Sequence, residues 1–532
     1  MKKLPLGIQS FRKLINGDYV YVDKTQFVYT LLNDSSYYFL SRPRRFGKSL
    51  LLDTIGEAFS GDKELFKDLF IYNTDYAFDM HPVLHLDMSV MANYTQECLI
   101  NEVTIELKKR IKYENFDIES GAPAGMFRSL IESYYVKYGK TVVVLIDEYD
   151  KPIIDNLNNP EIAEANRNFL RGFYGVLKSM DTYLRLTFIT GVSKFTKTSI
   201  FSGLNNLRDI SLSKKYTCIC GIEVAELNKY FADNISNMSS QNNVGEYKDI
   251  YENILRWYDG YSWDGVNRLI NPYSLLNFFN EAKFSGYWFD SGTPKFLIDI
   301  IKKRPDGFSD LNDVEMGDWA LNSFDLQNLT AAPLLFQTGY LTIKKIHWDQ
   351  IPPVYSMGAP NHEVKMAFNL NILSSFTEND DLLTETIYRK IKTALEIGDL
   401  NSALESLKAL FSSIPYELHI KREAYYHSIF YAIMNIFGFN IDAEVSVSGG
   451  RIDAVLELAD KVYIFEFIYI YCADDVESSE KQKITKKTLD EGIGQIKSRG
   501  YANKYIGQGK KIYLAAFAFL GRDDINMRIE TT

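Results

Sequence analysis

The sequence predicts an α/β fold: a parallel sheet with helices on both faces, followed by a mainly helical middle region and a smaller C-terminal α/β domain. Three observations lead to this prediction. Strand-like apolar runs alternate with helical stretches through residues 1–215, as in proteins built on a parallel sheet. An arginine-rich loop joins one such run to a helix near residue 45, and another run ends in two adjacent acids near residue 147.

The opening segment combines a short strand-like run with an amphipathic helix. Residues Tyr19–Val22 have strand character, and Asp23 is placed to cap the helix that follows. Residues 7–11 or 21–25 are candidates to flank a nucleotide base. Packing of the first helix is the more common role for the individual residues.

The stretch Tyr37–Leu51 reads YYFLSRPRRFGKSLL and has the strand, loop and helix order of a phosphate-binding loop. Such a loop presents backbone N–H groups and the positive end of a helix to an anion. We expect Lys48 to reach the outer phosphates of ATP and the Ser49 hydroxyl to ligate Mg²⁺. The loop residues expected to contact the nucleotide are Arg44, Arg45, Phe46, Gly47, Lys48, Ser49 and Leu50.

One position of this loop departs from the general pattern G-x-x-x-x-G-K-[ST]. Arg42 stands where the pattern has its first glycine, which usually allows a tight bend. A G-K-S tripeptide alone also fits a surface turn carrying a lysine. The assignment therefore depends on a second motif.

That motif is Thr141–Asp150, which reads TVVVLIDEYD. A strand buried on both faces has this composition, and ligands bind at the carboxyl ends of such strands. We expect Asp147 to hold Mg²⁺ and Glu148 to orient and deprotonate the attacking water. Acidic pairs also begin ordinary solvated loops, but joined to Lys48 and Ser49 this pair predicts a site for ATP and Mg²⁺.

Further elements fill the sheet around these motifs. A core strand is expected over residues 81–89, helices over 97–112, 126–137 and 161–180, and a strand over 184–191.

The strand over residues 184–191 supplies two candidates for a residue that senses the γ-phosphate, Thr190 and Ser193. Isolated residues of these types are more often helix caps. Arg171 and Arg208 are candidates for an arginine finger, although most arginines are simply surface residues.

The middle region is rich in aromatic residues from Trp257 to Ile298. Stacked rings suit nucleic acid, but the helical spacing of the apolar residues favours core packing. Residues 217–222 (TCICGI) read as a strand whose Cys218 and Cys220 suit a metal, yet no second cysteine pair follows. Residues 386–411 read as bundle-like helices.

The C-terminal part returns to strands. A helix is expected over residues 423–437, strands over 441–448, 451–458 and 461–469, a polar helix over 479–499, and a last strand over 510–520. Asp453 and Glu466 lie within strands among apolar neighbours. Burying an acid is costly unless it is paired or holds a metal, so both indicate a site.

Phrases throughout the chain resemble a family of bacterial predicted ATPases of the AAA type joined to a PD-(D/E)XK nuclease-like domain. They are YVDKT, RPRRFGKSL, LIDEYDKPI and FITGVSKF, then WYDGY, NPYSLLNF, LLFQTGYLTI and PNHEV, and finally GRIDAVLE, YIFEF and QIKSRGYANKY. The family shares the arginine-rich loop. Arg42 therefore departs from the general pattern but not from this group.

The resemblance implies a nuclease site with Glu423 on the first helix, Asp453 and Glu466 as Mg²⁺ ligands on the central strands, and Gln495 on the following helix. The chain departs from its relatives at Ile468, which replaces the lysine of E-F-K and removes a cation that activates water.

Two outcomes follow from this departure. A migrated lysine takes over the role, the candidates being Lys461, Lys483 and Lys486, or the domain keeps only a nucleic-acid-binding or structural role.

The composition and the N-terminal segment indicate the binding partners and the cellular location. A formal charge of −10 argues against an overall cationic coat, although the basic residues of 481–499 offer a local face for DNA or RNA. Four scattered cysteines favour a reducing compartment, and the N-terminal MKKLPLGIQSF has no signal-peptide core, so a cytoplasmic location without a membrane is expected. The sequence leaves the oligomeric state open.

Together these observations predict three domains: an ATPase domain over residues 1–215, a mainly helical region over 216–415 and a nuclease-like domain over 416–532. The predicted function is Mg²⁺-dependent ATP hydrolysis coupled to a nuclease-like domain that binds nucleic acid and cleaves weakly or not at all. The alternative is a nucleotide switch without hydrolysis, whose C-terminal domain recognises a partner.

Overall fold

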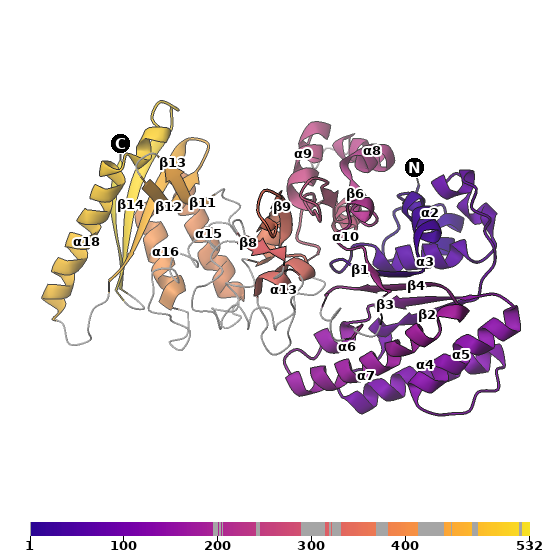
Figure 1. The fold of residues 1–532 in the computed structure, drawn as a ribbon. Helices are drawn as coiled ribbons and strands as arrows, with labels where there is room; N and C mark the ends of the chain where they lie inside the picture. The colour runs from indigo at the N-terminus through magenta and orange to yellow at the C-terminus, as the bar shows by residue number, and fades with distance from the viewer. Residues whose placement is uncertain are drawn as a thin grey trace. The chain divides into compact units, whose positions relative to one another are not determined.

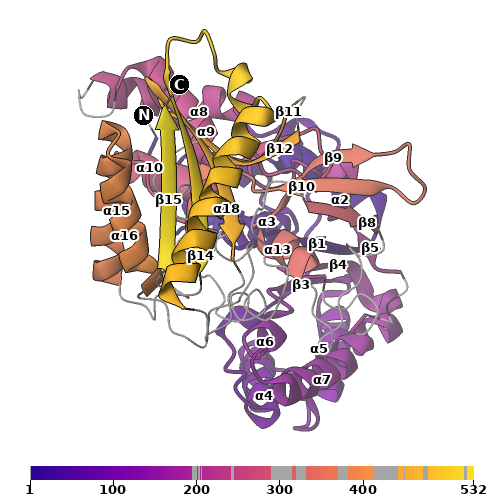
Figure 2. The ribbon, with the colours of Figure 1, turned by 90° about the vertical axis from the view of Figure 1, so that its left-hand side faces the viewer.

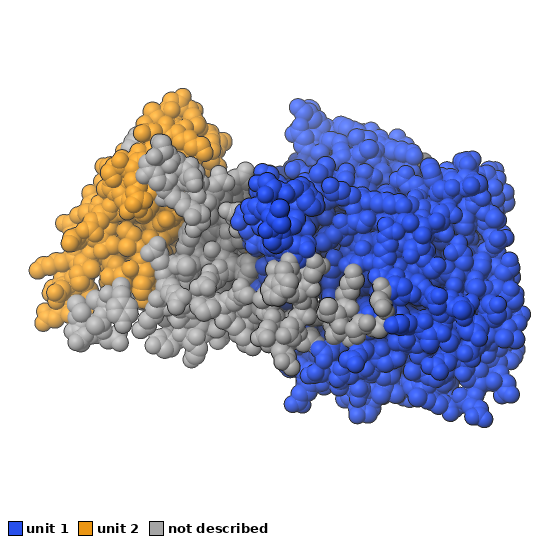
Figure 3. All heavy atoms as spheres, in the orientation of Figure 1, with its two compact units in different colours: residues 1–297, 312–364 blue, residues 298–311, 365–532 orange. Residues whose placement is uncertain are grey.

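A computed structural model (Figure 1) describes most of the chain. The described residues are 2–194, 200–201, 204, 206–240, 245–288, 314–318, 321, 331–368, 381–412, 441–447, 450–470, 477–520 and 524–531. The chain divides into two compact units, residues 1–297 with 312–364 and residues 298–311 with 365–532 (Figure 3). Each unit is described by itself below.

The first unit is built on a five-stranded parallel sheet in the order β2-β3-β4-β1-β5. Its strands are β1 (Tyr37–Ser41), β2 (Val83–Asp87), β3 (Val142–Asp147), β4 (Leu184–Gly191) and β5 (Arg208–Asp209). All residues of β1 and β3 are buried, as expected for strands covered on both faces. The strand β4 is inserted between β1 and β3, so the ends of these three strands meet at one edge.

Helices cover both faces of this sheet (Figure 1). On one face lie α4 (Gln96–Glu114), α5 (Pro123–Tyr138), the short α6 (Lys151–Ile154) and α7 (Pro160–Ser179). On the other lie α1 (Phe11–Asn16), α2 (Thr25–Asp34) and α3 (Lys48–Ala58). The buried residues of α4 recur at every fourth position from Leu99 to Ile111, which makes one apolar stripe toward the sheet.

The middle region packs within the first unit. It contains β6 (Ile222–Glu223), α8 (Val224–Ser240), α9 (Tyr247–Tyr258), β7 (Leu269–Ile270) and α10 (Pro272–Glu281). It continues with β8 (Val314–Gly317), α13 (Ala331–Thr338), β9 (Thr342–His347) and β10 (Val354–Gly358). The last three strands form an antiparallel sheet in the order β8-β10-β9.

The second unit has a five-stranded sheet in the order β11-β12-β13-β14-β15. Its strands are β11 (Ile441–Val447), β12 (Gly450–Glu457), β13 (Lys461–Tyr469), β14 (Lys511–Leu520) and β15 (Asp524–Thr531), with only β13 and β14 parallel. One face is covered by α18 (Ser478–Ser498), and the other by α15 (Asp381–Ile397) and α16 (Leu400–Ser412) (Figure 2).

Side-chain alternation along β13 explains this sandwich. Tyr463, Phe465 and Phe467 pack toward α15 and α16, whereas Val462 and Ile464 pack toward α18. Glu466 shares the register of the second set. It therefore lies on the α18 face.

Most predicted elements are confirmed, and three details are wrong. Residues 19–22 form no strand beyond an isolated bridge between Tyr19 and Lys3. Residues 217–221 turn instead of extending, since Gly221 has a left-handed φ of 86° and β6 begins only at Ile222. The strand over 510–520 is not the last one, because β15 follows it and forms the edge of the sheet. The helix predicted over 423–437 lies outside the described residues.

Among the helices that the structure describes, none combines the length and apolar character needed to cross a membrane.

Candidate functional site

The phosphate loop runs from the end of β1 to the start of α3. Gly47 has a φ of 91°, a left-handed conformation that suits glycine and turns the chain into the helix. Lys48 is buried, and its Nζ donates to the carbonyl oxygens of Arg42 and Pro43, both at 3.0 Å. Ser49 follows in the first turn of α3 and is partly exposed. The ammonium therefore lies inside the loop, where it is held by neutral acceptors that an anion can replace.

The predicted acids lie at the same edge of the sheet. Asp147 ends β3, and the Thr190 hydroxyl of the neighbouring β4 donates to Asp147 Oδ1 at 2.5 Å. The backbone N–H of Glu148 donates to the same oxygen at 3.0 Å. The structure thus brings Thr190 and the acid pair together, and the parallel register sets Ser41 of β1 beside Gly191.

Glu148 has an unusual backbone. Its φ is 49°, a left-handed value that is rare for a residue with a side chain and that recurs at functional sites. Burial raises the pKa of Glu148, while the nearby Lys48 ammonium opposes this shift. The carboxylate therefore lies within electrostatic reach of the phosphate loop.

Ser193 lies elsewhere than Thr190. Its hydroxyl and its backbone N–H both donate to Asp150 Oδ2 at 2.6 Å, and the Val192 N–H donates to the same carboxylate. Burial raises the pKa of Asp150, and the bonds from Ser193 oppose this shift. Ser193 is fully buried and holds the turn after β3 against the end of β4.

Arg42, which stands where the general pattern has a glycine, holds the start of the loop through its side chain. Its guanidinium is fully buried and donates to the carbonyl oxygens of Ser41, Ser211, Tyr216 and Thr217. It also lies 4.0 Å from the centre of the Trp263 ring. Burial lowers the pKa of Arg42 to about 10. The loop is therefore anchored from its first position by a side chain.

The aromatic phrase of the middle region packs on the same loop. Phe46 meets Tyr261 and Trp263 edge-on, with ring centres 4.9 and 5.2 Å apart. Tyr261 and Trp263 are buried. These rings form core rather than an exposed stacking surface, as the apolar spacing favours.

Three further contacts join the middle region to the loop and to the segment after β4. The Trp288 Nε1–H donates to the Arg44 carbonyl at 3.3 Å. The backbone N–H of Lys194, just beyond β4, donates to Gln337 Oε1 of α13 at 3.0 Å. Gly339, just after α13, lies so close to the loop that a Cβ added to it would be 2.8 Å from Pro43 Cβ. Sequence patterns did not indicate these contacts.

An apolar cavity opens beside the loop, between the lead-in segment and the middle region. Part of the 21–25 stretch lines it, whereas residues 7–11 do not. Cys220 also lines it as a free, buried thiol, and burial raises its pKa. The cavity has the apolar character expected of a pocket for a nucleotide base. Its lining includes Leu14, Val20, Tyr21, Val22, Phe46, Leu50, Cys220, Phe231 and Leu276.

The oxygen donors at this edge suit Mg²⁺, which prefers hydroxyl, carboxylate and phosphate oxygens. Both hydrogen bonds described for the Asp147 carboxylate reach Oδ1, which leaves Oδ2 for a metal or its water. Ser49 adds a hydroxyl from α3.

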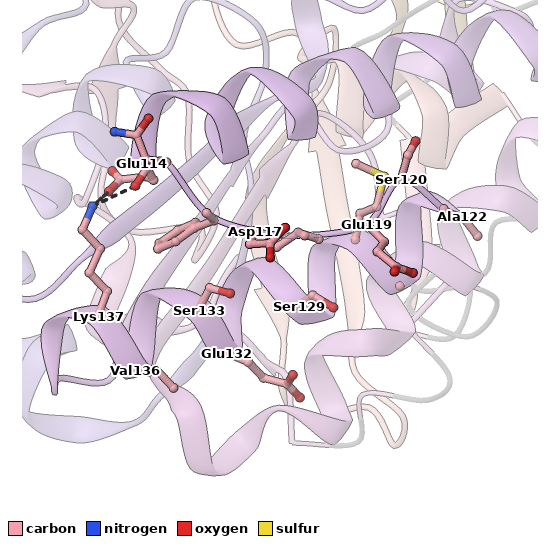
Figure 4. A pocket seen from close by; sticks show the side chains of 16 residues that line it. Glu114, Asp117, Glu119, Ser120, Ala122, Ser129, Glu132, Ser133, Val136 and Lys137 are labelled. Atoms are coloured by element: carbon pink, nitrogen blue, oxygen red, sulfur yellow. Dashed lines mark hydrogen bonds and ion pairs between the residues drawn. The ribbon is translucent and has the colours of Figure 1, made fainter.

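A separate surface hollow lies between α4, α5 and the segment that joins them (Figure 4). Its lining carries acids, including Glu114, Asp117, Glu119 and Glu132. Glu114 is already bound by Lys137 at 2.6 Å. Because an acidic lining repels a triphosphate, this hollow is not the nucleotide site.

The two predicted finger arginines do not join the site. Arg208 forms an ion pair with Asp34 at 2.7 Å, and Arg171 is an exposed residue of α7.

In the second unit, Asp453, Glu466 and Gln495 lie together. Strand alternation sets Asp453 of β12 and Glu466 of β13 on the face that α18 covers, and Gln495 of α18 donates its amide to Glu466 Oε1. The Phe467 N–H donates to Asp453 Oδ2 at 2.8 Å. Two carboxylates beside an amide oxygen suit Mg²⁺. Glu423 lies outside the described residues.

The candidates for a migrated lysine lie away from these acids. Lys461 begins β13 and pairs with Asp460 at 2.5 Å. Lys483 and Lys486 precede Gln495 on α18 by about 18 and 13 Å of helix rise. Ile468 itself packs at Gly492 of α18, where an added Cβ would lie 3.0 Å from Ile468 Cδ1.

Arg499 is nearer to the acids than these lysines. It follows Gln495 by one helical turn, and its N–H donates to the Gln495 carbonyl at 3.0 Å. A hydrogen bond to Tyr501 raises the pKa of Arg499, and the charges of Glu466 and Asp453 add to the shift. Sequence reasoning placed Arg499 only in a basic face.

The loop, the acid strand and the inserted strand define the class: a P-loop nucleotide-binding protein of the AAA-like type. Residues 5–201 match the family model described as Predicted AAA-ATPase, and residues 421–528 match that of the PD-(D/E)XK nuclease superfamily. The chain is 35% identical over 526 residues to an "Uncharacterized protein in vnfD 5'region" of Azotobacter chroococcum mcd 1, covering 97% of this chain and 96% of that protein.

The chain therefore belongs to the family of predicted AAA-ATPases joined to a PD-(D/E)XK nuclease superfamily domain, and the resemblance is confirmed. Among solved structures, the Aeropyrum pernix ORC2 protein in ADPNP–ADP complexes is 10% identical and covers 68% of this chain and 98% of its own, with a TM-score of 0.27.

Proposed function

We propose that this protein is a Mg²⁺-dependent ATPase whose nucleotide cycle is coupled to a C-terminal domain that binds DNA or RNA and cleaves it weakly or not at all. The observation that carries the ATPase proposal is the contact between Thr190 of β4 and Asp147 of β3, beside Glu148 and the loop of Lys48. A loop, an acid pair and a polar strand end are the parts that ATP hydrolysis needs at one edge of a sheet.

In this proposal each residue has a defined role. Lys48 leaves the carbonyls of its own loop for the β- and γ-phosphates, and the N–H groups at the start of α3 bind the phosphate oxygens. Glu148 orients the attacking water and accepts its proton. As the water oxygen bonds to the γ-phosphorus, the bond to the β–γ bridging oxygen breaks and leaves ADP and phosphate. Thr190 positions the γ-phosphate through its place beside Asp147.

Mg²⁺, held by Ser49 and Asp147, would neutralise charge on the phosphates when bound. The apolar cavity beside Phe46 and Cys220 would receive the base.

The C-terminal proposal starts from the cluster of Asp453, Glu466 and Gln495. These residues suit a metal near a phosphodiester, but Ile468 places a hydrocarbon where a cation would activate the water. The exposed basic residues of α18 supply a surface for nucleic-acid phosphates. Binding with little cleavage is the expected behaviour.

The test of the ATPase proposal is phosphate release by the purified full chain and by its Glu148→Gln variant. We expect the wild type to release phosphate in Mg²⁺ and the variant to lose at least about a hundredfold of that rate, because it lacks the base. The variant should still bind ATPγS with an affinity within about threefold.

A wild-type chain that binds ATPγS but releases no phosphate would support the nucleotide switch instead. A Glu148→Gln variant that turns over at the wild-type rate would remove Glu148 from the mechanism.

A further inference from the structure

We propose that Arg44, within the phosphate loop, is a catalytic arginine that contacts the γ-phosphate from the same chain and stabilises the charge that develops during hydrolysis. This inference rests on the ATPase function proposed above. In other nucleotide hydrolases, an arginine that stabilises the charge of the transition state raises kcat strongly, and a second chain often supplies it.

The position of Arg44 is fixed from its backbone. Its carbonyl oxygen accepts the Trp288 Nε1–H at 3.3 Å, so the middle region holds the loop at this residue. Its side chain is 33% exposed and reaches Asp155, with 3.7 Å between Arg44 Nη2 and Asp155 Oδ1. Asp155 directly follows α6, the short helix after Glu148. The ion pair therefore bridges the loop and the segment that carries the water-activating acid.

The ion pair holds the Arg44 guanidinium between the phosphate loop and the segment that follows Glu148. A cation there is near the point where the γ-phosphate and the attacking water would meet.

The resting ion pair is easily exchanged. A partly exposed ion pair at 3.7 Å contributes little to stability. A triphosphate carries more negative charge than one carboxylate and accepts several hydrogen bonds from a guanidinium. Asp155 also has a second cation, since Lys151 Nζ lies 2.8 Å from its Oδ2. When Arg44 turns to the phosphate, Asp155 keeps this partner.

The other arginines of the loop are committed differently. Arg42 is buried and bound to four carbonyl oxygens. The Arg45 guanidinium lies over the Tyr273 ring, 4.9 Å from its centre, toward the middle region. Among these three, Arg44 is the one whose side chain faces the acid-bearing segment.

The proposed step is the hydrolysis already described. The γ-phosphorus gains the water oxygen and loses the bridging oxygen, Glu148 receives the proton, and the Arg44 guanidinium donates hydrogen bonds to phosphoryl oxygens throughout. No electron transfer or further reactant is involved.

The experiment compares Arg44→Ala, Arg44→Lys and Asp155→Asn with the wild-type full chain, and uses Arg128→Ala as the control because Arg128 is an exposed residue of α5. Three quantities are measured: phosphate release, affinity for ATPγS, and trapping of ADP with aluminium fluoride and Mg²⁺, which mimics the transition state.

We expect Arg44→Ala to lower kcat by about 10³-fold and to lose trapping, with ATPγS affinity changed by less than about tenfold. Arg44→Lys should recover part of the rate, because lysine keeps the charge without the planar fork. Asp155→Asn and Arg128→Ala should trap ADP and aluminium fluoride as the wild type does.

If Arg44 only supports Asp155 structurally, Asp155→Asn will reproduce the loss of trapping, and the inference is overturned. It is also overturned if Arg44→Ala keeps the wild-type kcat and trapping. A wild type without phosphate release would instead refute the ATPase proposal itself, so the two failures are distinguishable.

Discussion

Arg42 shows how one residue changes the construction of a familiar loop. In the general pattern a glycine bends the chain at this point, whereas here a buried guanidinium ties the loop to four carbonyl oxygens and to Trp263. The carbonyl oxygens of Ser211, Tyr216 and Thr217, which follow β5, accept hydrogen bonds from the two terminal nitrogens and so offset part of the cost of burying this cation. The turn that replaces the predicted strand over 217–222 thus has a structural reason.

Restoring the general pattern should therefore harm the protein. We expect Arg42→Gly to destabilise the first unit by about 3 kcal/mol, because it leaves buried carbonyls without donors and creates a cavity. Thermal unfolding would show this as a transition lowered by at least about 5 °C.

The control for this prediction is Arg45→Gly. Arg45 is exposed and has a φ of 66°, a value that glycine adopts without strain, so the same change of residue type should leave the transition within about 2 °C. Equal stability of Arg42→Gly and the wild type would contradict the anchoring role.

At the scale of elements, α13 and the residues after it contact the phosphate loop and the segment that follows β4. Gln337 of α13 accepts a hydrogen bond from the backbone N–H of Lys194, three residues beyond β4, and Gly339 lies against Pro43 of the loop. If the loop or β4 shifts when a nucleotide binds, α13 must move with it or lose these contacts. The middle region is in a position to respond to the nucleotide.

Gly339 allows a direct test of this contact. An added Cβ would lie 2.8 and 2.9 Å from Pro43 Cβ and Cγ, so Gly339→Ala must displace the loop. We expect the affinity for ATPγS to fall at least about tenfold, about 1.4 kcal/mol, in an equilibrium binding measurement.

Gly139→Ala is the matched control. Gly139 also has a left-handed φ, 62°, but nothing lies within 4 Å of an added Cβ. It should share the backbone strain without the loss of affinity. If both variants bind ATPγS equally well, the contact between Gly339 and Pro43 does not shape the site.

These elements also show what the sequence could and could not predict. The loop of Lys48, the strand of Asp147 and the strand of Glu466 were predictable because each is a local pattern of apolar run, turn and polar residue. The contacts of Trp288 and Gln337 were not, since their partners are 244 and 143 residues away and depend on tertiary packing. The edge strand β15 was missed because most of its residues are only partly buried and lack a clear alternation.

At the scale of the whole molecule, the two compact units match two different families. The first contains the match to predicted AAA-ATPases, and the second contains the match to the PD-(D/E)XK nuclease superfamily, with Asp453, Glu466 and Gln495 close together. Ile468 packs against Gly492 of α18. It lies on the same face of β13 as Glu466, the face that α18 covers. A hydrocarbon side chain therefore stands where the family resemblance led us to expect a lysine.

Replacing this residue should restore cleavage. We expect Ile468→Lys to increase Mg²⁺-dependent nicking of supercoiled plasmid at least about tenfold over the wild-type full chain, because the ammonium can activate the water and stabilise the transition state. Ile468→Leu is the control for packing, and adding Asp453→Ala should abolish any gain.

Strong cleavage by the wild type that disappears in Asp453→Ala would contradict this prediction. It would mean that another cation, for which Arg499 is best placed, already serves the site.

The most direct test of the central claim is the rate of phosphate release from ATP by the Lys48→Ala full chain in Mg²⁺, measured beside the wild type. If the Lys48 amine, Asp147 and Glu148 act on one triphosphate, the variant will release phosphate at the background rate while unfolding at the wild-type temperature. A correctly folded Lys48→Ala chain that hydrolyses ATP at the wild-type rate would contradict the account.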